Sequence, residues 1–217
     1  MKKLKKLLYN FFHQKVSSVQ TNIDAQIPKF DLSEAHISNL KVLPNRRVLL
    51  ENLPKNGIVA ELGVNKGDFS EEILEISKPQ KFHLVDAWGS ERYHLGLRKV
   101  IESKFQGQIA LGKLIINQGL STDMAAKFQD SYFDWIYIDT DHSYEVTKAE
   151  LQSYKAKMNV GGIIAGHDYT QGNWGKLRRY GVMEAVHEFC VIENWELIYL
   201  TIEMSDNPSF AIRKIKS

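Results

Sequence analysis

The sequence predicts a doubly wound α/β fold, in which helices cover both faces of a mostly parallel sheet. From residue 57 onward, short apolar runs alternate with longer amphipathic segments, as in repeated strand–helix–strand units. Seven runs are expected to be strands: 57–62, 81–87, 113–117, 133–138, 162–166, 196–202 and 209–215. The turn residues Asn207 and Pro208 separate the last two runs, so we expect the final strand to be antiparallel.

Five amphipathic segments after residue 57 are expected to be helices, at 69–77, 91–105, 122–128, 144–157 and 182–192. Residues 31–53 also have a helical pattern, in two pieces that Pro44 separates. Ligands of such open sheets bind beyond the carboxyl ends of the strands. The residues that directly follow each strand are therefore the first candidates for chemistry.

Residues 1–30 are expected to form an amphipathic helix and a linker ahead of one domain, which spans 31–217. The first 16 residues combine five lysines with apolar residues at helical spacing, and Ser17–Lys29 is expected to be the linker. The apolar part of this helix is too short for a secretory signal or a membrane span. It could pack on its own domain or on a second copy in a homo-oligomer, or make peripheral contact with an anionic membrane.

The composition excludes some classes of protein. The net charge of +2 argues against a dedicated nucleic-acid binder. The single cysteine, Cys190, permits neither an intrachain disulfide nor a thiolate metal cluster, and it fits a reducing, cytoplasmic compartment.

A glycine loop follows the first predicted strand, where the chain reads Glu61-Leu62-Gly63-Val64-Asn65-Lys66-Gly67-Asp68-Phe69. Gly63 and Gly67 allow a tight turn and close approach of the backbone to a ligand. The spacing matches neither the dinucleotide fingerprint nor the phosphate-binding P-loop. Asp86 ends the second strand, where a carboxylate can accept the hydroxyls of a ribose. These features together predict a cofactor with a nucleoside end.

Two later strand ends carry a cluster of ionisable groups. Asp139, Asp141 and His142 follow the fourth strand, and His167 and Asp168 follow the fifth. If these strands are neighbours, the side chains converge on one mouth, and clustered carboxylates need a cation or a shared proton. Oxygen ligands suit Mg²⁺, Mn²⁺ or Ca²⁺, and a histidine ligand favours a transition metal.

The glycine loop together with Asp86 resembles class I S-adenosylmethionine-dependent methyltransferases, which have a Rossmann-like sheet. The segment 119–123 resembles the turn of catechol-type O-methyltransferases that lies against the adenine. Since Leu120 cannot hydrogen-bond the adenine amino group, that contact would come from Ser121 or Gln118. The resemblance implies cofactor contacts from Glu61, Gly63, Val64, Asn65, Gly67, Asp68, Phe69, Asp86, Ala87, Trp88, Gln118, Gly119, Leu120, Ser121 and Asp139.

Residues 133–151 and 161–169 resemble the small single-domain group that includes the macrolide-sugar O-methyltransferases. This resemblance implies a divalent metal, Mg²⁺ or Mn²⁺, held by Asp139, His167 and Asp168, with His142 as general base. Related enzymes more often have a carboxylate at position 167. The segment Thr170–Gly181 is expected to contact the acceptor through Trp174, Tyr180, Lys176, Arg178 and Arg179.

The sequence thus predicts a methyltransferase that acts on a hydroxyl of a small molecule, with a sugar or glycan-like acceptor. Asp139 would be either a metal ligand or a neighbour of the sulfonium group. Three alternatives stay open: a metal-independent enzyme in which His142 acts alone, a nicotinamide-dependent oxidoreductase, and a non-catalytic binding module. The absence of the Gly-x-Gly-x-x-Gly pattern disfavours the oxidoreductase.

Overall fold

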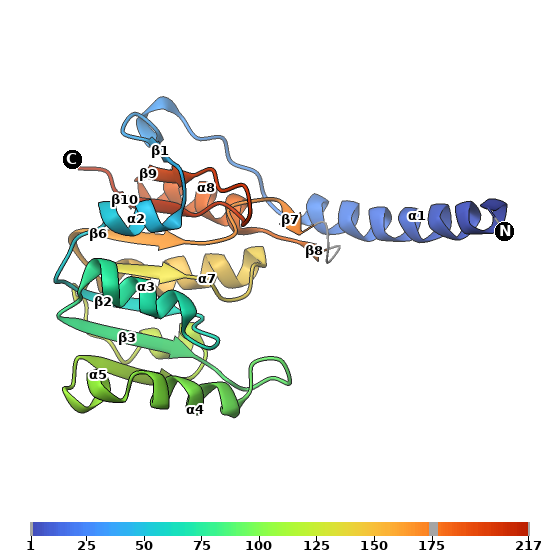
Figure 1. Cartoon of the computed structure of the whole chain (residues 1–217). Helices are drawn as coiled ribbons and strands as arrows, with labels where there is room; N and C mark the ends of the chain where they lie inside the picture. Colours follow the sequence, from blue (N-terminus) through green and yellow to red (C-terminus); the bar gives the residue numbers. More distant parts are fainter. Residues whose placement is uncertain (1, 174–177, 217) are drawn as a thin grey trace.

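The computed structural model describes residues 2–173 and 178–216, and their main element is an eight-stranded sheet (Figure 1). Its spatial order is β1-β9-β10-β6-β5-β2-β3-β4, and β10 alone runs antiparallel to the other strands. The strands are β1 Lys41–Leu43, β2 Ile58–Leu62, β3 Lys81–Asp86, β4 Leu114–Gln118, β5 Phe133–Ile138, β6 Met158–Gly166, β9 Trp195–Thr201 and β10 Phe210–Lys214. The predicted fold class, with its antiparallel last strand, is confirmed.

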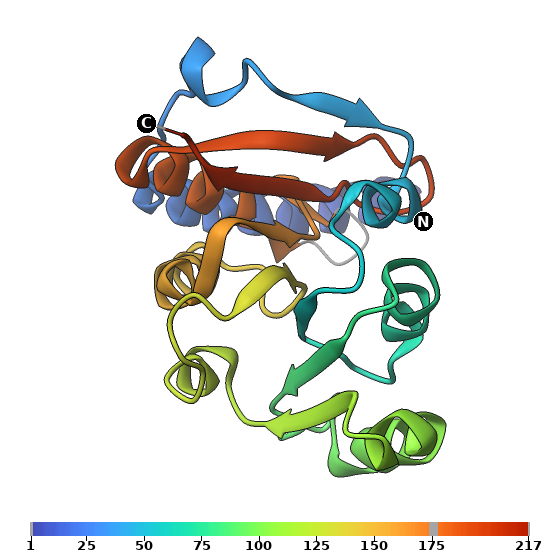
Figure 2. The same ribbon diagram turned by 90° about the vertical axis from the view of Figure 1, so that its left-hand side faces the viewer.

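Helices cover both faces of this sheet (Figure 2). The helices are α1 Lys2–Gln26, α2 Arg46–Asn52, α3 Asp68–Ser77, α4 Leu95–Lys104, α5 Gln106–Ala110, α6 Ser121–Ala125, α7 Tyr144–Tyr154 and α8 Val182–Glu193. One face carries α2 to α5 and the other carries α6 to α8. Successive strand residues enter opposite cores, as the period of two requires: Val59 packs with the first group of helices and Ala60 with the second.

The sheet has eight strands where the sequence predicted seven, because residues 31–53 are only partly helical. The short 3₁₀ helix Glu34–His36 and α2 are helical, but Lys41–Leu43 forms β1 and pairs in parallel with β9. β1 covers the edge of β9 over its last three residues, Tyr199 to Thr201. Pro44 then separates β1 from α2, whose N-cap Asn45 accepts a hydrogen bond from the Val48 amide at 3.0 Å.

Helix α1 runs to Gln26, through most of the segment predicted to be a linker. No glycine or proline precedes Pro28, and the hydroxyls of Ser18 and Thr21 donate to backbone carbonyls within the helix. Its last turn meets the strand β8 (Arg178–Arg179), where Arg179 donates to Asp24 at 2.8 Å. The rest of α1 projects away from the sheet (Figure 1). Among the described residues, no helix has the length and apolar character that a membrane crossing requires.

The carboxyl ends of β2, β3, β5 and β6 lie at one edge of the sheet. Because β10 is reversed, it enters the sheet from this same edge. The loop before β10, with Asp206 and Asn207, therefore reaches the mouth formed by the other strand ends, where Asn207 donates to Asp168. The sequence analysis did not place this loop at the site.

Candidate active site

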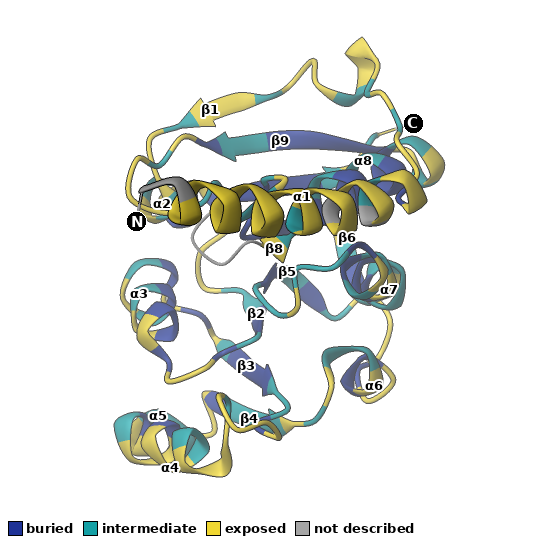
Figure 3. Cartoon of the chain, turned by 90° about the vertical axis from the view of Figure 1, so that its right-hand side faces the viewer, coloured by how far each residue is buried: buried dark blue, intermediate teal, exposed yellow. Residues whose placement is uncertain are grey.

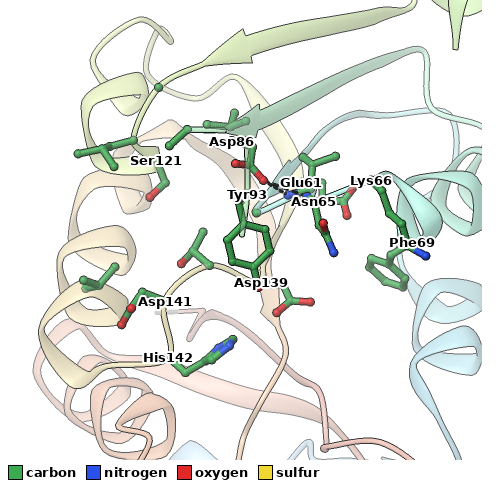
Figure 4. A pocket seen from close by; sticks show the side chains of 18 of the residues that line it. Glu61, Asn65, Lys66, Phe69, Asp86, Tyr93, Ser121, Asp139, Asp141 and His142 are labelled. Carbon is green, nitrogen blue, oxygen red and sulfur yellow. Dashed lines mark hydrogen bonds between the residues drawn. The ribbon is translucent and has the colours of Figure 1, made fainter. Parts of the chain in front are cut away.

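A cavity of about 470 Å³ opens at the carboxyl ends of β2 to β5 (Figure 4). Most of the residues predicted to contact a cofactor line it. They are Glu61, Gly63, Val64, Asn65, Asp68, Phe69, Asp86, Ala87, Gly119, Leu120, Ser121 and Asp139. Residues from four strand ends thus converge on one cavity, as the topology of an open parallel sheet requires.

Gly63 is where the end of β2 meets the end of β5. Its φ is +87°, and a Cβ at this position would lie 2.0 Å from the carbonyl oxygen of Asp139. Only glycine tolerates both the left-handed backbone and this close approach. The contact fixes the glycine loop against Asp139, which the sequence predicted to lie at the reacting end.

Asp86 holds the glycine loop in place. Its Oδ2 accepts hydrogen bonds from the amides of Val64 and Asn65, at 2.8 and 2.9 Å, and its Oδ1 accepts from the amide of Trp88 at 2.9 Å. A carboxylate has about four lone-pair sites, so roughly one remains for a ligand hydroxyl. Asp86 can accept one ribose hydroxyl in this arrangement, where the sequence analysis expected it to accept both.

Three of the predicted cofactor residues are not among the residues that line the cavity. Trp88 is buried, and its indole donates to the Asn65 carbonyl at 3.0 Å. Gln118 donates to the Ala87 carbonyl and accepts from Arg98. Gly67, with φ of +79°, packs beneath α4 and starts α3. These three residues support the loop and the neighbouring turns.

Glu61 and Arg46 both line the cofactor cavity. Burial raises the pKa of Glu61 to about 8, and the hydroxyl of Ser70 donates to its carboxyl group. Arg46, from the first turn of α2, lies 4.7 Å from the centre of the Phe69 ring and 3.6 Å from Asp206. The sequence analysis missed Arg46, and no motif marks it, because α2 approaches the cavity only through the tertiary fold.

Glu150 is a second residue that the sequence analysis missed. It is fully buried on α7, and it accepts hydrogen bonds from Ser121 after β4 and from Thr140 after β5, the latter at 2.7 and 2.9 Å. Burial raises the pKa of Glu150 to about 7. This carboxyl group ties together two turns that line the cavity.

Three of the five residues of the predicted ionisable cluster come together, while Asp141 is exposed and pairs with Arg178. Ligand atoms of Asp139, His142 and Asp168 all lie within 4.8 Å of one another, and Nδ1 of His142 is 2.9 Å from Oδ2 of Asp168. The predicted metal set contained His167 in place of His142. Nδ1 of His167 lies farther out, 3.5 Å from Asp168 and 3.9 Å from Asp139. Its Nε2 is buried without a hydrogen-bond partner among the described residues, 3.7 Å from Asp206.

Burial and charge act differently on the members of this cluster. Burial raises the pKa of Asp139. Burial also acts to raise the pKa of Asp168, but hydrogen bonds with His142 and His167 outweigh it, and this pKa lies far below its ordinary value. Burial acts to lower the pKa of His167, but the adjacent carboxylates of Asp168 and Asp139 raise it above its ordinary value. The cluster thus holds an ionised carboxylate directly against His142.

A smaller cavity of about 260 Å³ adjoins the first. Its lining residues are Arg92, Tyr93, Thr140, Asp141, His142, Arg178 and Tyr180. Tyr93, Thr140, Asp141 and His142 line both cavities and lie between them. The ring of Tyr180 lies 4.7 Å from that of His142.

Only part of the predicted acceptor segment faces this smaller cavity. Arg178 lies at its rim, 2.7 Å from Asp141. Arg179 points away and pairs with Asp24 and Glu184, so it holds α1 and α8 together and does not line this cavity. Trp174 and Lys176 lie outside the described residues.

The profile of a known family, described as a methyltransferase domain, matches residues 60–169. The match covers 110 of the 217 residues, from β2 to just beyond Asp168. The chain belongs to this family. The resemblance to class I S-adenosylmethionine-dependent methyltransferases is thereby confirmed, and the matched segment of the methyltransferase contains both the glycine loop and the ionisable cluster.

Solved structures with the same fold include several methyltransferases. A protein from Corynebacterium glutamicum matches with a TM-score of 0.59 at 10% identity, over 97% of this chain and 98% of that one. An O-methyltransferase from Bacillus cereus in complex with SAH matches with a TM-score of 0.58 at 16% identity, over 93% and 90%. The tRNA methyltransferase TrmK of B. subtilis matches with a TM-score of 0.57 at 12% identity, over 80% and 67%. At these identities the likeness shows the fold alone. No curated protein matches the sequence.

Proposed function

We propose that this methyltransferase moves the methyl group of S-adenosylmethionine to a hydroxyl of a small, sugar-like acceptor, with His142 as general base. The observation that carries the proposal is the position of His142 between the two cavities. His142 lines both the larger cavity, which has the size and residues for a nucleoside cofactor, and the smaller one beside it. A base in this position lies where donor and acceptor would meet.

The larger cavity supports the donor assignment residue by residue. The glycine loop would offer backbone groups to the methionine part, Asp86 has acceptor capacity for a ribose hydroxyl, and Ser121, which lines the same cavity, would face the adenine. Arg46 supplies a cation for the carboxylate of the methionine part. Glu61, with its raised pKa, holds a proton at neutral pH and so limits the negative charge beside Asp139.

The reaction is an in-line displacement at the methyl carbon. The acceptor oxygen forms a bond to that carbon while the carbon–sulfur bond breaks, and S-adenosylhomocysteine leaves as a neutral thioether. The hydroxyl proton passes to Nε2 of His142, because Nδ1 faces Asp168 at 2.9 Å. The ionised Asp168 orients the imidazole and stabilises the imidazolium that forms.

The cluster also fits a divalent metal. Two carboxylates and an imidazole are a donor set that Mn²⁺ and Mg²⁺ accept. We assign the metal to Asp139 and Asp168 with His167 as the nitrogen ligand, since both ring nitrogens of His142 already have a proposed role: Nδ1 holds Asp168 at 2.9 Å and Nε2 accepts the proton. A bound metal would lower the pKa of the acceptor hydroxyl.

The proposal is tested by methyl transfer from labelled S-adenosylmethionine to a panel of monosaccharides, nucleotide sugars and polyhydroxylated small molecules, with RNA as a comparison. We expect label in a base-stable ether of a sugar-like acceptor and higher turnover with Mn²⁺ or Mg²⁺ than after treatment with a chelator. Label in RNA alone would contradict the acceptor class. An unchanged rate after chelation would favour the metal-independent alternative, and calorimetric binding of NADH in place of S-adenosylmethionine would overturn the donor.

A further inference from the structure

Helix α1 exposes an apolar stripe. Leu4, Leu7, Leu8, Phe11 and Phe12 fall at the i, i+3, i+4, i+7, i+8 spacing of one helix face, and Val19 continues the same stripe. Each of these side chains is at least half exposed, with Leu7 and Phe12 both at 61%. Figure 3 shows the helix crossing in front of the carboxyl edge of the sheet with almost its whole length exposed. The prediction that α1 could pack on its own domain therefore does not hold for this stripe.

The charge of α1 indicates what kind of surface the stripe meets. Lys2, Lys3, Lys5, Lys6 and Lys15 give the first fifteen residues +5, and no acidic residue precedes Asp24. The remaining residues therefore carry −3, since the whole chain carries +2. Pairing of α1 with α1 of a second copy would bring lysines together with no acidic side chain in the stripe to offset them. An anionic surface therefore complements this helix better than α1 of a second copy does.

The lysine side chains are also arranged as in a helix that lies in a membrane interface. Lys5 lies beside Phe12 at the border of the stripe in a helical projection, and Lys15 lies within the stripe with its ammonium 5.1 Å from the Phe11 ring centre. A lysine stem can follow an apolar surface while its ammonium reaches the lipid headgroups. The 25-residue helix is not apolar enough to cross a bilayer, which fits a helix that lies in the interface plane.

The C-terminal end of α1 contacts the strand that borders the smaller cavity. Arg179 donates to Asp24 in the last turn of α1, and the adjacent Arg178 lies at the rim of the smaller cavity. We propose that α1 docks the enzyme on an anionic lipid bilayer through its apolar stripe and its lysines, with the acceptor mouth next to the docked helix. The docking of α1 does not depend on the proposed reaction, whereas the position of the acceptor mouth rests on the proposed function.

Vesicle co-sedimentation of the full chain tests the proposal. We expect the chain to sediment with vesicles of phosphatidylcholine mixed with phosphatidylglycerol, and to be released by high salt. Lys5→Glu/Lys6→Glu should weaken partitioning about 25-fold or more, since each lysine at an anionic surface contributes about five-fold. Leu8→Asp/Phe12→Asp should weaken it about 100-fold, because two large apolar side chains no longer enter the interface.

A matched control separates the stripe from charge alone. Asn10→Asp/Ser17→Asp makes the same change in net charge on the polar face of the helix, and it should keep clearly more binding than Leu8→Asp/Phe12→Asp. All these side chains are exposed, so each variant should keep the thermal midpoint of the wild type. Failure of the wild type to sediment with anionic vesicles would overturn the proposal, as would equal loss in the stripe and control variants. If the wild type does not bind vesicles, analytical ultracentrifugation tests the other occupant. The stripe would bind a second copy if the wild type and the control variant are dimeric and only Leu8→Asp/Phe12→Asp is monomeric.

Discussion

The buried Glu150 predicts a specific pH dependence of stability. Its pKa is about 7 in the folded protein, against an ordinary value of 4.5. The folded state therefore binds the proton more tightly than the unfolded chain, and stability is fully present below pH 4.5 and is lost as the pH rises through 7. The difference between these two pKa values corresponds to about 3 kcal/mol of stability.

Glu150→Gln removes this titration and keeps a carbonyl oxygen for the hydroxyls of Ser121 and Thr140. We expect the difference in free energy of unfolding, variant minus wild type, to rise by about 3 kcal/mol between pH 4 and pH 8.5. Urea unfolding at a series of pH values measures this difference. The matched control is Glu145→Gln, on the exposed face of the same helix, which should follow the wild-type pH curve. If the curves of Glu150→Gln and wild type are parallel, the argument from burial is refuted.

Four further predictions concern the site. His142→Ala should lower kcat by about 100-fold or more with little change in affinity for S-adenosylmethionine, as measured by single-turnover kinetics and calorimetry. Arg46→Met should weaken S-adenosylmethionine binding about ten-fold or more in calorimetry and leave binding of adenosine unchanged, because only the methionine carboxylate is affected. His167→Gln should weaken Mn²⁺ binding about ten-fold or more, while His142→Gln should not, and the reverse result would exchange the two roles. Gly63→Ala should cost more than about 2 kcal/mol in urea unfolding, because its Cβ would meet the Asp139 carbonyl oxygen at 2.0 Å.

Much of the site could be predicted because its residues directly follow buried strands. The apolar runs that become β2, β3 and β5 are short and bounded, and parallel strands must end at one edge. The glycine loop, Asp86 and Asp139 therefore had to lie close together once the strand–helix alternation was recognised. Ser143 is a similar case, since its position before an amphipathic run predicts an N-cap, and its hydroxyl accepts from the Val146 amide.

The residues that were missed or misplaced have no local signal of this kind. Arg46 belongs to a short helix that packs beside α3, so its place at the cavity depends on contacts between distant segments. Trp88 sits one residue beyond Ala87, yet its φ of +42° turns the indole into the core beneath the loop. Strand β1 is three residues long, which is too short for a pattern of period two to be recognised. In each case contacts between distant segments, and not the local sequence, determine where the residue or strand lies.

The loop between β9 and β10 shows how one reversed strand changes a site. In a wholly parallel sheet this loop would be part of a crossover and would not join the two strands at one edge. Here the antiparallel β10 brings the loop back to the mouth, where the Pro208 carbonyl accepts from the Tyr169 amide at 2.9 Å and Asn207 donates to Asp168. Asp206, in the same loop, lies 3.6 Å from Arg46 and 3.7 Å from His167. The loop therefore links the residue proposed to bind the cofactor carboxylate to the residues proposed to hold the metal and orient the base, and none of these contacts follows from a motif.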